Sequence, residues 1–200
     1  MKILALELST ARGSLAWLDE DIIDFTRDWP NDRKNSSLFF ENLDAVRKKF
    51  GPPDKIIVGL GPGSYAGTRI AISAAIGLQI SSGAHLMGYP SISAMECNTD
   101  EYCVIGDARR KSFFFACIRM NNLVEGPTLL PESELKLKLE TIRIEMPVFT
   151  SDSLPQFERA VFRFPSALLL AKFAREPHRS FSLPPLEPIY LREPHVTMPK

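Results

Sequence analysis

The residue types most suited to chemistry in this chain gather in a glycine-rich corner. Gly61, Gly63 and Gly67 lie between the apolar run 56–58 and a long stretch without charges. Glycine permits positive φ angles and the close approach of another backbone or of a ligand. Backbone N–H groups at such a corner can cradle a phosphate where a helix begins. The corner lacks the Gly-Lys-Ser/Thr ending of a P-loop, so we favour a packing corner that launches a helix.

Charged side chains beside apolar runs are the next candidates. Asp107 and Arg109 stand two residues apart at the end of such a run, so in an extended chain both point to one face. Because no second metal ligand is near in the sequence, we favour an ion pair within the chain or a loop clamp over the positioning of metal-bound water. Arg69 is suited to bind an anion or to anchor its helix to another part of the molecule, and we favour the anchor. The basic run 109–111 is typical of a solvated turn.

The sequence offers little for metal or nucleophilic catalysis. His85, His178 and His195 are isolated, without the spacing that places two ligands on one helical face. Three cysteines, at positions 97, 103 and 117, form no Cys-x-x-Cys pair, and their odd number predicts reduced, structural thiols. We therefore predict no catalytic residue, no metal site and no cofactor held by this chain alone.

Composition and charge limit the function classes further. The 200 residues include 24 basic and 24 acidic side chains, so no bulk attraction to nucleic acid or to an anionic membrane is expected. The apolar run at the N-terminus is broken by Glu7 and lacks the pattern of a secretory signal. The uncharged stretch 70–84 is shorter than the ~18 residues that suggest a membrane span. We expect a cytoplasmic protein without a membrane contact.

The elements that position these residues form an α/β pattern. An opening meander of strands is expected at 2–8, 14–18 and 22–27, followed by a polar loop at 31–35 and a helix over 36–50. Further strands are expected at 55–60, 84–88, 102–106, 113–119, in a hairpin arm after 121–122, and at 147–150; further helices are expected at 70–84, 91–96, 132–139 and 166–175. A boundary near Thr99 and Asp100 divides the chain into 1–98 and 99–200.

The helix predicted over 70–84 is apolar around most of its circumference. A helix of this kind must be covered on more than one side, by its own sheet and by something else. We predict that it forms a subunit interface, homodimeric when the chain is alone. The predicted interface residues are Ile70, Ala71, Ser73, Ala74, Ala75, Gly77 and Leu78.

Four collinear segments resemble the TsaB (YeaZ) family. The corner 61–70 is similar to the family signature Gly-Pro-Gly-Ser-Phe-Thr-Gly-hydrophobic-Arg-Ile, and 105–109 is similar to Ile-Asp-Ala-Arg. The opening 2–10 resembles the first strand, with Glu7 where the family carries Asp, and 187–192 resembles the terminal Pro-hydrophobic-Tyr-Leu-Arg. The residues that carry these motifs are Glu7, Gly61, Gly63, Ser64, Gly67, Arg69, Asp107, Arg109, Tyr190 and Arg192.

The chain departs from the family pattern in three places. Asn35 and Ser36 stand where the first helix of the family usually starts with His-Ser or His-Thr. The chain is also shorter than typical members, and the loss falls in 120–180. Glu7 occupies the position of the first-strand carboxylate of the wider superfamily, and is either a relic of a magnesium–nucleotide site or a solvated residue.

The resemblance implies a fold and a function. The fold is that of the actin, sugar-kinase and Hsp70 superfamily, with two RNase H-like subdomains of which the second is reduced. The function is a non-catalytic subunit of the machinery that installs threonylcarbamoyl on N6 of adenosine 37 in tRNA. The implied partners are TsaD, TsaE through the complex, and tRNA within the complex, with ATP and metal bound by the partner subunits. A small-molecule kinase or ATPase and a glycoprotease-like peptidase remain the alternatives.

Overall fold

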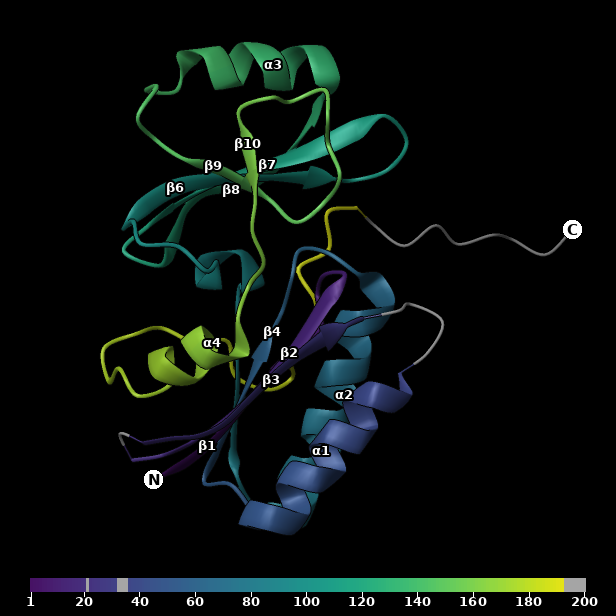
Figure 1. Ribbon diagram of the computed structural model, residues 1–200, viewed down its shortest axis with the longest axis vertical. Helices are drawn as coiled ribbons and strands as arrows, with labels where there is room; N and C mark the ends of the chain where they lie inside the picture. Colours follow the sequence, from purple (N-terminus) through teal and green to yellow (C-terminus); the bar gives the residue numbers. More distant parts are fainter. Residues whose placement is uncertain (21, 32–35, 193–200) are drawn as a thin grey trace, which may run out of the picture.

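The chain folds into two α/β halves, each built on a five-stranded sheet (Figure 1). The computed structural model describes residues 1–20, 22–31 and 36–192. The first half contains β1 (Lys2–Glu7), β2 (Arg12–Asp19), β3 (Ile22–Pro30), α1 (Ser37–Phe50), β4 (Lys55–Gly59), α2 (Tyr65–Ser82) and β5 (His85–Tyr89). After the 3-10 helix η1 (Ser91–Ala94) come β6 (Glu101–Asp107), β7 (Ser112–Arg119), β8 (Asn122–Pro131), α3 (Glu132–Thr141), β9 (Val148–Thr150), β10 (Ala160–Phe162) and α4 (Ala167–Phe173).

Both sheets have the same topology. The first runs β3-β2-β1-β4-β5 and the second β10-β9-β6-β7-β8, so each has its first strand at the centre. In each sheet three consecutive strands form an antiparallel meander, and two further strands add in parallel on the other side of the central strand. Two copies of this arrangement confirm the predicted fold class of two RNase H-like subdomains.

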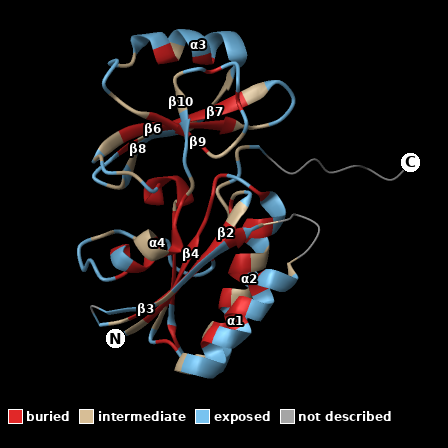
Figure 2. Cartoon of the chain, viewed as in Figure 1, coloured by how far each residue is buried: buried red, intermediate tan, exposed pale blue. Residues whose placement is uncertain are grey.

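Helices cover the first sheet on both faces. Along β1, Leu4 and Leu6 join the cluster that packs on α1 and α2, whereas Ile3 and Ala5 face the cluster around α4. This alternation follows from the two-residue period of a strand, and a strand that is covered on both sides is apolar throughout. The buried residues accordingly run through the centre of this half of the molecule (Figure 2).

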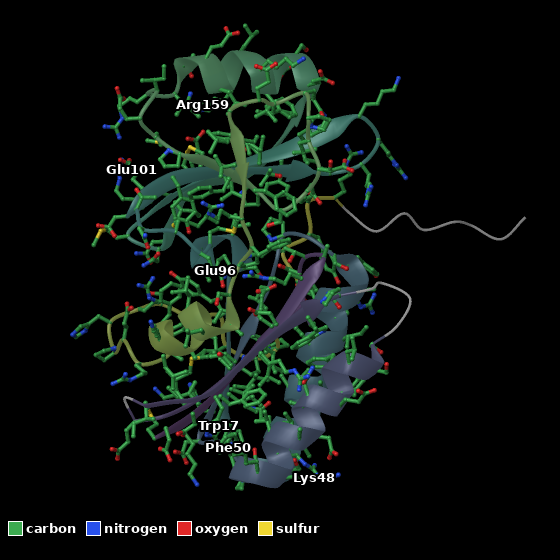
Figure 3. The ribbon with its side chains drawn as sticks, viewed as in Figure 1. Trp17, Lys48, Phe50, Glu96, Glu101 and Arg159 are labelled. Atoms are coloured by element: carbon green, nitrogen blue, oxygen red, sulfur yellow. A yellow bond between two sulfur atoms is a disulfide. The ribbon has the colours of Figure 1, made fainter. Side chains whose placement is uncertain are left out.

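The second subdomain is the smaller one. Its two parallel strands β9 and β10 have three residues each, and no helix lies in the described segment between them. Helix α3 covers one face of the sheet. Arg159, which Figure 3 labels beneath that helix, donates hydrogen bonds to the carbonyls of Leu139, Ile142 and Met146 around the C-terminal end of α3. One guanidinium thus satisfies carbonyls that helix ends leave without partners.

The chain returns to the first subdomain after β10. Helix α4 packs on β1, β2 and β4, and the N–H of Ala167 donates to the hydroxyl of Ser14 at 2.9 Å. Residues 167–174 therefore contribute to the core of the first sheet, although they stand late in the sequence. The division between residues 98 and 99 stays a prediction. Residues 167–174 lie after this division in the sequence but pack in the first subdomain.

Three features differ from the sequence predictions. Helix α2 begins at Tyr65, five residues before the predicted start, because Ser64 caps it by accepting the N–H of Gly67 at 3.2 Å. Strand β10 was not predicted. Cys103 and Cys117 form a disulfide instead of free thiols, since register places them directly opposite each other on β6 and β7. The N–H of Cys103 donates instead to the carbonyl of Pro147, just before β9, at 2.9 Å, so Cys103 and Cys117 are a non-hydrogen-bonded pair, in which side chains lie closest.

Candidate functional site

A cleft of about 450 Å³ lies between the two sheets, where β1, β4 and β6 end. The first subdomain contributes Ser9 and Thr10 after β1 and Gly63 to Ala66 at the start of α2. The second subdomain contributes Asp107 and Arg109, and the C-terminal segment 188–192 closes one side. The cleft thus brings together segments that carry all four motifs of the sequence, although Glu7, Gly61, Gly67 and Arg69 do not line it.

The glycine corner is a joint between backbone segments. A Cβ at Gly63 would lie 2.0 Å from the carbonyl oxygen of Ser9, and one at Gly67 would lie 2.1 Å from that of Leu8. The N–H of Ser64 already donates to the Ser9 carbonyl at 2.6 Å. Gly61 adopts φ +87°, which favours glycine. Backbone carbonyl oxygens of the segment after β1 therefore lie directly against Gly63 and Gly67, and the Ser9 carbonyl already occupies the N–H of Ser64.

Glu7 is sealed beneath the cleft, so the interpretation as a solvated residue is wrong. Its side chain is fully buried, and its Oε1 accepts the N–H of Ser9 at 2.6 Å. Oε2 has no hydrogen-bond partner among the described residues, and a Cβ at Gly59 would lie only 1.7 Å from it. Burial raises the pKa of the Glu7 carboxyl above its ordinary value, and the nearby Ser9 and Ser91 hydroxyls offset part of that rise.

Replacing Glu7 by glutamine is expected to remove a pH dependence of stability. A carboxyl whose pKa is raised in the folded state stabilises the protein below its unfolded pKa, and this contribution is lost as pH rises through the folded pKa. The free energy of unfolding of Glu7→Gln relative to the wild type should rise with pH over that window, by up to about 1.4 kcal/mol per pH unit. Urea unfolding at a series of pH values measures the difference. A difference that stays constant with pH would show that the pKa of Glu7 is the same in the folded and unfolded protein.

Asp107 and Arg109 form the ion pair that their spacing predicted. Arg109 donates from its guanidinium to Asp107 Oδ2 at 2.9 Å and from its N–H to Oδ1 at 2.7 Å. Asp152, just after β9, accepts the N–H of Asp107 at 2.9 Å. Arg109, Arg110 and Lys111 all adopt positive φ angles, so the β6–β7 turn is left-handed without a glycine. Its exposed cations lie beside the cleft.

Within 1–20, 22–31 and 36–192, Arg69 contacts its own helix and not the other subdomain, which corrects the favoured interpretation as an anchor. It is exposed, lies over the ring of Tyr65 one turn earlier in the same helix, and donates to the Tyr65 hydroxyl. The ring of Tyr65 contacts that of Tyr190 in the C-terminal segment, with centroids 5.7 Å apart. Arg192 Nη2 donates to the carbonyl of Arg109 at 3.5 Å. The two C-terminal motif residues therefore reach both sides of the cleft.

The residues predicted to form a partner interface divide into three groups. Ala71, Ala75 and Leu78 are buried against the first sheet, so the structure removes them from any outward face. Ile70 and Ala74 are half-buried, and Ser73 and Gly77 are exposed. Sequence reasoning missed two members of the outward face, Ile76 and Ile80, whose exposed fractions are 39% and 80%. Their helical spacing from Ser73 was the signal that could have assigned them.

No group of three or more histidine, cysteine, aspartate or glutamate side chains within 1–20, 22–31 and 36–192 is placed to hold a metal ion. The departure at Asn35, like His195, falls outside the described residues. Across the same ranges, no helix is long and apolar enough to cross a membrane.

Comparisons with known proteins agree with this geometry. A family model for TsaD, the tRNA N6-adenosine threonylcarbamoyltransferase, matches residues 36–127. The solved structure of an uncharacterized protein with similarity to peptidase YEAZ from Pseudomonas aeruginosa is 22% identical, covers 96% of this chain and 99% of its own, and has a TM-score of 0.71. YeaZ from Pseudomonas aeruginosa is 21% identical over 87% of this chain and 91% of its own, with a TM-score of 0.67. No curated protein matches the sequence.

The chain has an α/β fold of two subdomains whose sheets share one topology, and the YeaZ structures share this fold. The shared fold extends over nearly the whole length of the YeaZ structures. This shared fold and the match to the TsaD model agree with the resemblance to the TsaB (YeaZ) family that the motifs indicated.

Proposed function

We propose that this chain is a non-catalytic scaffold subunit of the cytoplasmic machinery that installs threonylcarbamoyl on N6 of adenosine 37 in tRNA. In this role it binds and supports TsaD, TsaE acts through the complex, and tRNA is contacted only within the complex. The isolated chain forms a homodimer through the same surface. ATP and metal are bound by the partner subunits.

The outward face of α2 is the observation that carries this proposal. Ser73, Ile76, Gly77 and Ile80 follow one another at helical spacing on its exposed side, and no charged residue interrupts them. Two large aliphatic side chains beside two small residues suit close packing against another helix, and interface cores are depleted of charge. Helix α1 lies alongside (Figure 1), so the partner would meet a two-helix surface.

The carboxylates at the ends of the two central strands support the non-catalytic part of the proposal. Glu7 ends β1 and is closed off from the cleft by burial under Gly59. Asp107 ends β6 and has both of its oxygens occupied by Arg109. A kinase or ATPase needs acidic groups that are free to position a metal ion or water. Internal contacts hold both candidates here.

Four measurements on the purified chain, three on the chain alone and one with TsaD, test the proposal. Calorimetry with Mg²⁺–ATP should give no tight binding and an assay with labelled ATP no phosphotransfer, whereas sedimentation with a TsaD protein should give a stable complex. Tight ATP binding with phosphotransfer would favour the kinase or ATPase alternative instead. Cleavage of a glycoprotein substrate would favour the peptidase. Failure to bind TsaD would overturn the scaffold assignment.

A further inference from the structure

Arg179 occupies an unusual position between the two subdomains. It follows α4 in the return segment, and only 7% of its side chain is exposed. Its guanidinium lies 4.4 Å from the ring centre of Phe173 and 5.3 Å from that of Tyr89. A cation between two aromatic rings is attracted to both ring faces. The side chain is therefore held in place by α4 and by β5 of the first sheet.

The polar atoms of Arg179 extend this contact to the second subdomain. Nη1 donates to the hydroxyl of Tyr89 at 2.7 Å and to the carbonyl of Asn121 at 3.2 Å. The Tyr89 hydroxyl in turn donates to the same Asn121 carbonyl at 2.8 Å. Glu176 Oε2 accepts from Nε and Nη2 of Arg179 and fixes the plane of the guanidinium. Asn121 belongs to the β7–β8 turn, so these atoms tie one sheet to the other.

A second tie crosses the cleft in the C-terminal segment 188–192. Ile189 packs on the core of the first subdomain, and its N–H donates to the Leu60 carbonyl at 2.8 Å. Leu191, two residues later, packs on the cluster of the second subdomain that includes Tyr102. In Figure 1 the loop after α4 lies to the left of the crossing between the halves, and the segment that ends at 192 lies to the right.

The crossing itself is double. The linker after η1 pairs with the returning chain through Met95 and Pro165, and the N–H of Ser166 donates to the Ala94 carbonyl at 2.9 Å. Arg12 of β2 forms an ion pair at 2.6 Å with Glu96, which Figure 3 labels between the two halves. Hinge motion needs a few residues that absorb a change in φ and ψ while the remainder separates freely. The two linker segments pair with each other, and there are ties on both sides of them. These contacts oppose rotation of one subdomain against the other in either direction.

We propose that the Arg179 tie and the C-terminal segment 188–192 lock the two subdomains at one separation. The chain is then a rigid body, and its cleft neither opens nor closes. This inference does not depend on the proposed function, because it concerns contacts within one chain.

Distances between spin labels test the lock. Labels at Glu41→Cys on α1 and Glu140→Cys on α3, in a Cys97→Ser background, report the separation of the halves. The full chain should give one narrow distance distribution that Mg²⁺–ATP leaves unchanged. Arg179→Ala combined with Leu191→Ala, which removes the packing of the C-terminal segment on the second subdomain, should give a distribution at least about twofold broader. Arg179→Lys with Leu191→Ala, which keeps the charge at position 179 but loses the planar set of donors, should also broaden it.

The controls separate the lock from a general loss of structure. Arg143→Ala removes an exposed ion pair with Glu101 that lies within the second subdomain, so the distribution should stay narrow. Far-ultraviolet circular dichroism identifies a variant that has unfolded. If the double variants unfold, the distance distribution of the labelled parent, in which both ties are intact, tests the proposal. A broad or two-peaked distribution in that parent, or an unchanged one in a folded Arg179 double variant, would overturn the proposal.

Discussion

Replacing Gly67 by alanine is expected to destabilise the protein by about 3 kcal/mol or more. Intrinsic preference predicts the opposite sign, since alanine is the better helix former by about 1 kcal/mol. The new Cβ would lie 2.1 Å from the carbonyl oxygen of Leu8, an atom of the chain that follows the central strand β1. A backbone oxygen cannot rotate away as a side chain can. The joint between β1 and α2 must therefore open, and the packing of α2 on the first sheet is weakened.

Gly77→Ala is the matched control for this prediction. Gly77 lies in the same helix, and a Cβ there would meet no atom within 4 Å. This variant should gain about 0.5–1 kcal/mol, because alanine loses less backbone entropy on folding. Urea unfolding of both variants gives the two free energies. If both variants change the free energy of unfolding alike, the close packing at Gly67 does not determine the stability of the junction between β1 and α2.

The second large effect is expected on association. Ile76→Arg combined with Ile80→Arg places two charges on the outward face of α2 and should weaken binding to TsaD at least about 30-fold, the loss typical of interface hot spots. A guanidinium at the centre of an apolar interface loses its water and gains no partner. Both side chains point away from the first sheet, so the stability of the isolated chain should change little. Titration calorimetry against TsaD measures the affinity.

Ile144→Arg controls for the added charge. Ile144 is 84% exposed, much like Ile80, but it follows α3 in the second subdomain. The affinity of the Ile144→Arg variant for TsaD should equal that of the wild type. An unchanged affinity of the Ile76/Ile80 double variant would show that the interface with TsaD does not lie on the outward face of α2. A loss with Ile144→Arg as large as with the double variant would point to a general effect of charge.

Much of the fold could be predicted because its patterns are local. The opening meander and helix α1 follow from apolar period and from turn residues, and the structure places them within a few residues of the expected positions. Asn121 and Asn122 marked the β7–β8 turn correctly, since asparagine tolerates the positive φ that Asn121 adopts. Strand β10 escaped notice because three residues, two of them exposed, carry no readable period.

The site was harder to predict because it depends on contacts distant in sequence. The apolar residues of α2 showed that the helix must be covered, but not that Ala71 and Ala75 face its own sheet. Glu7 looked like the end of a strand, and only Gly59 and Ser91, far along the chain, make it a sealed carboxyl. The role of Arg179 between the subdomains could not be predicted, since the partners that tie the two sheets come from β5 and the β7–β8 turn.

The most direct test of the central proposal is reconstitution of the tRNA modification. TsaD, TsaE, the threonylcarbamoyl-adenylate synthase, ATP and unmodified tRNA are combined with and without this chain, and modified adenosine is measured by mass spectrometry. We expect modification with the wild-type chain and with Ile144→Arg, and little with the Ile76/Ile80 double variant. Equal modification in the presence and absence of the wild-type chain would contradict it.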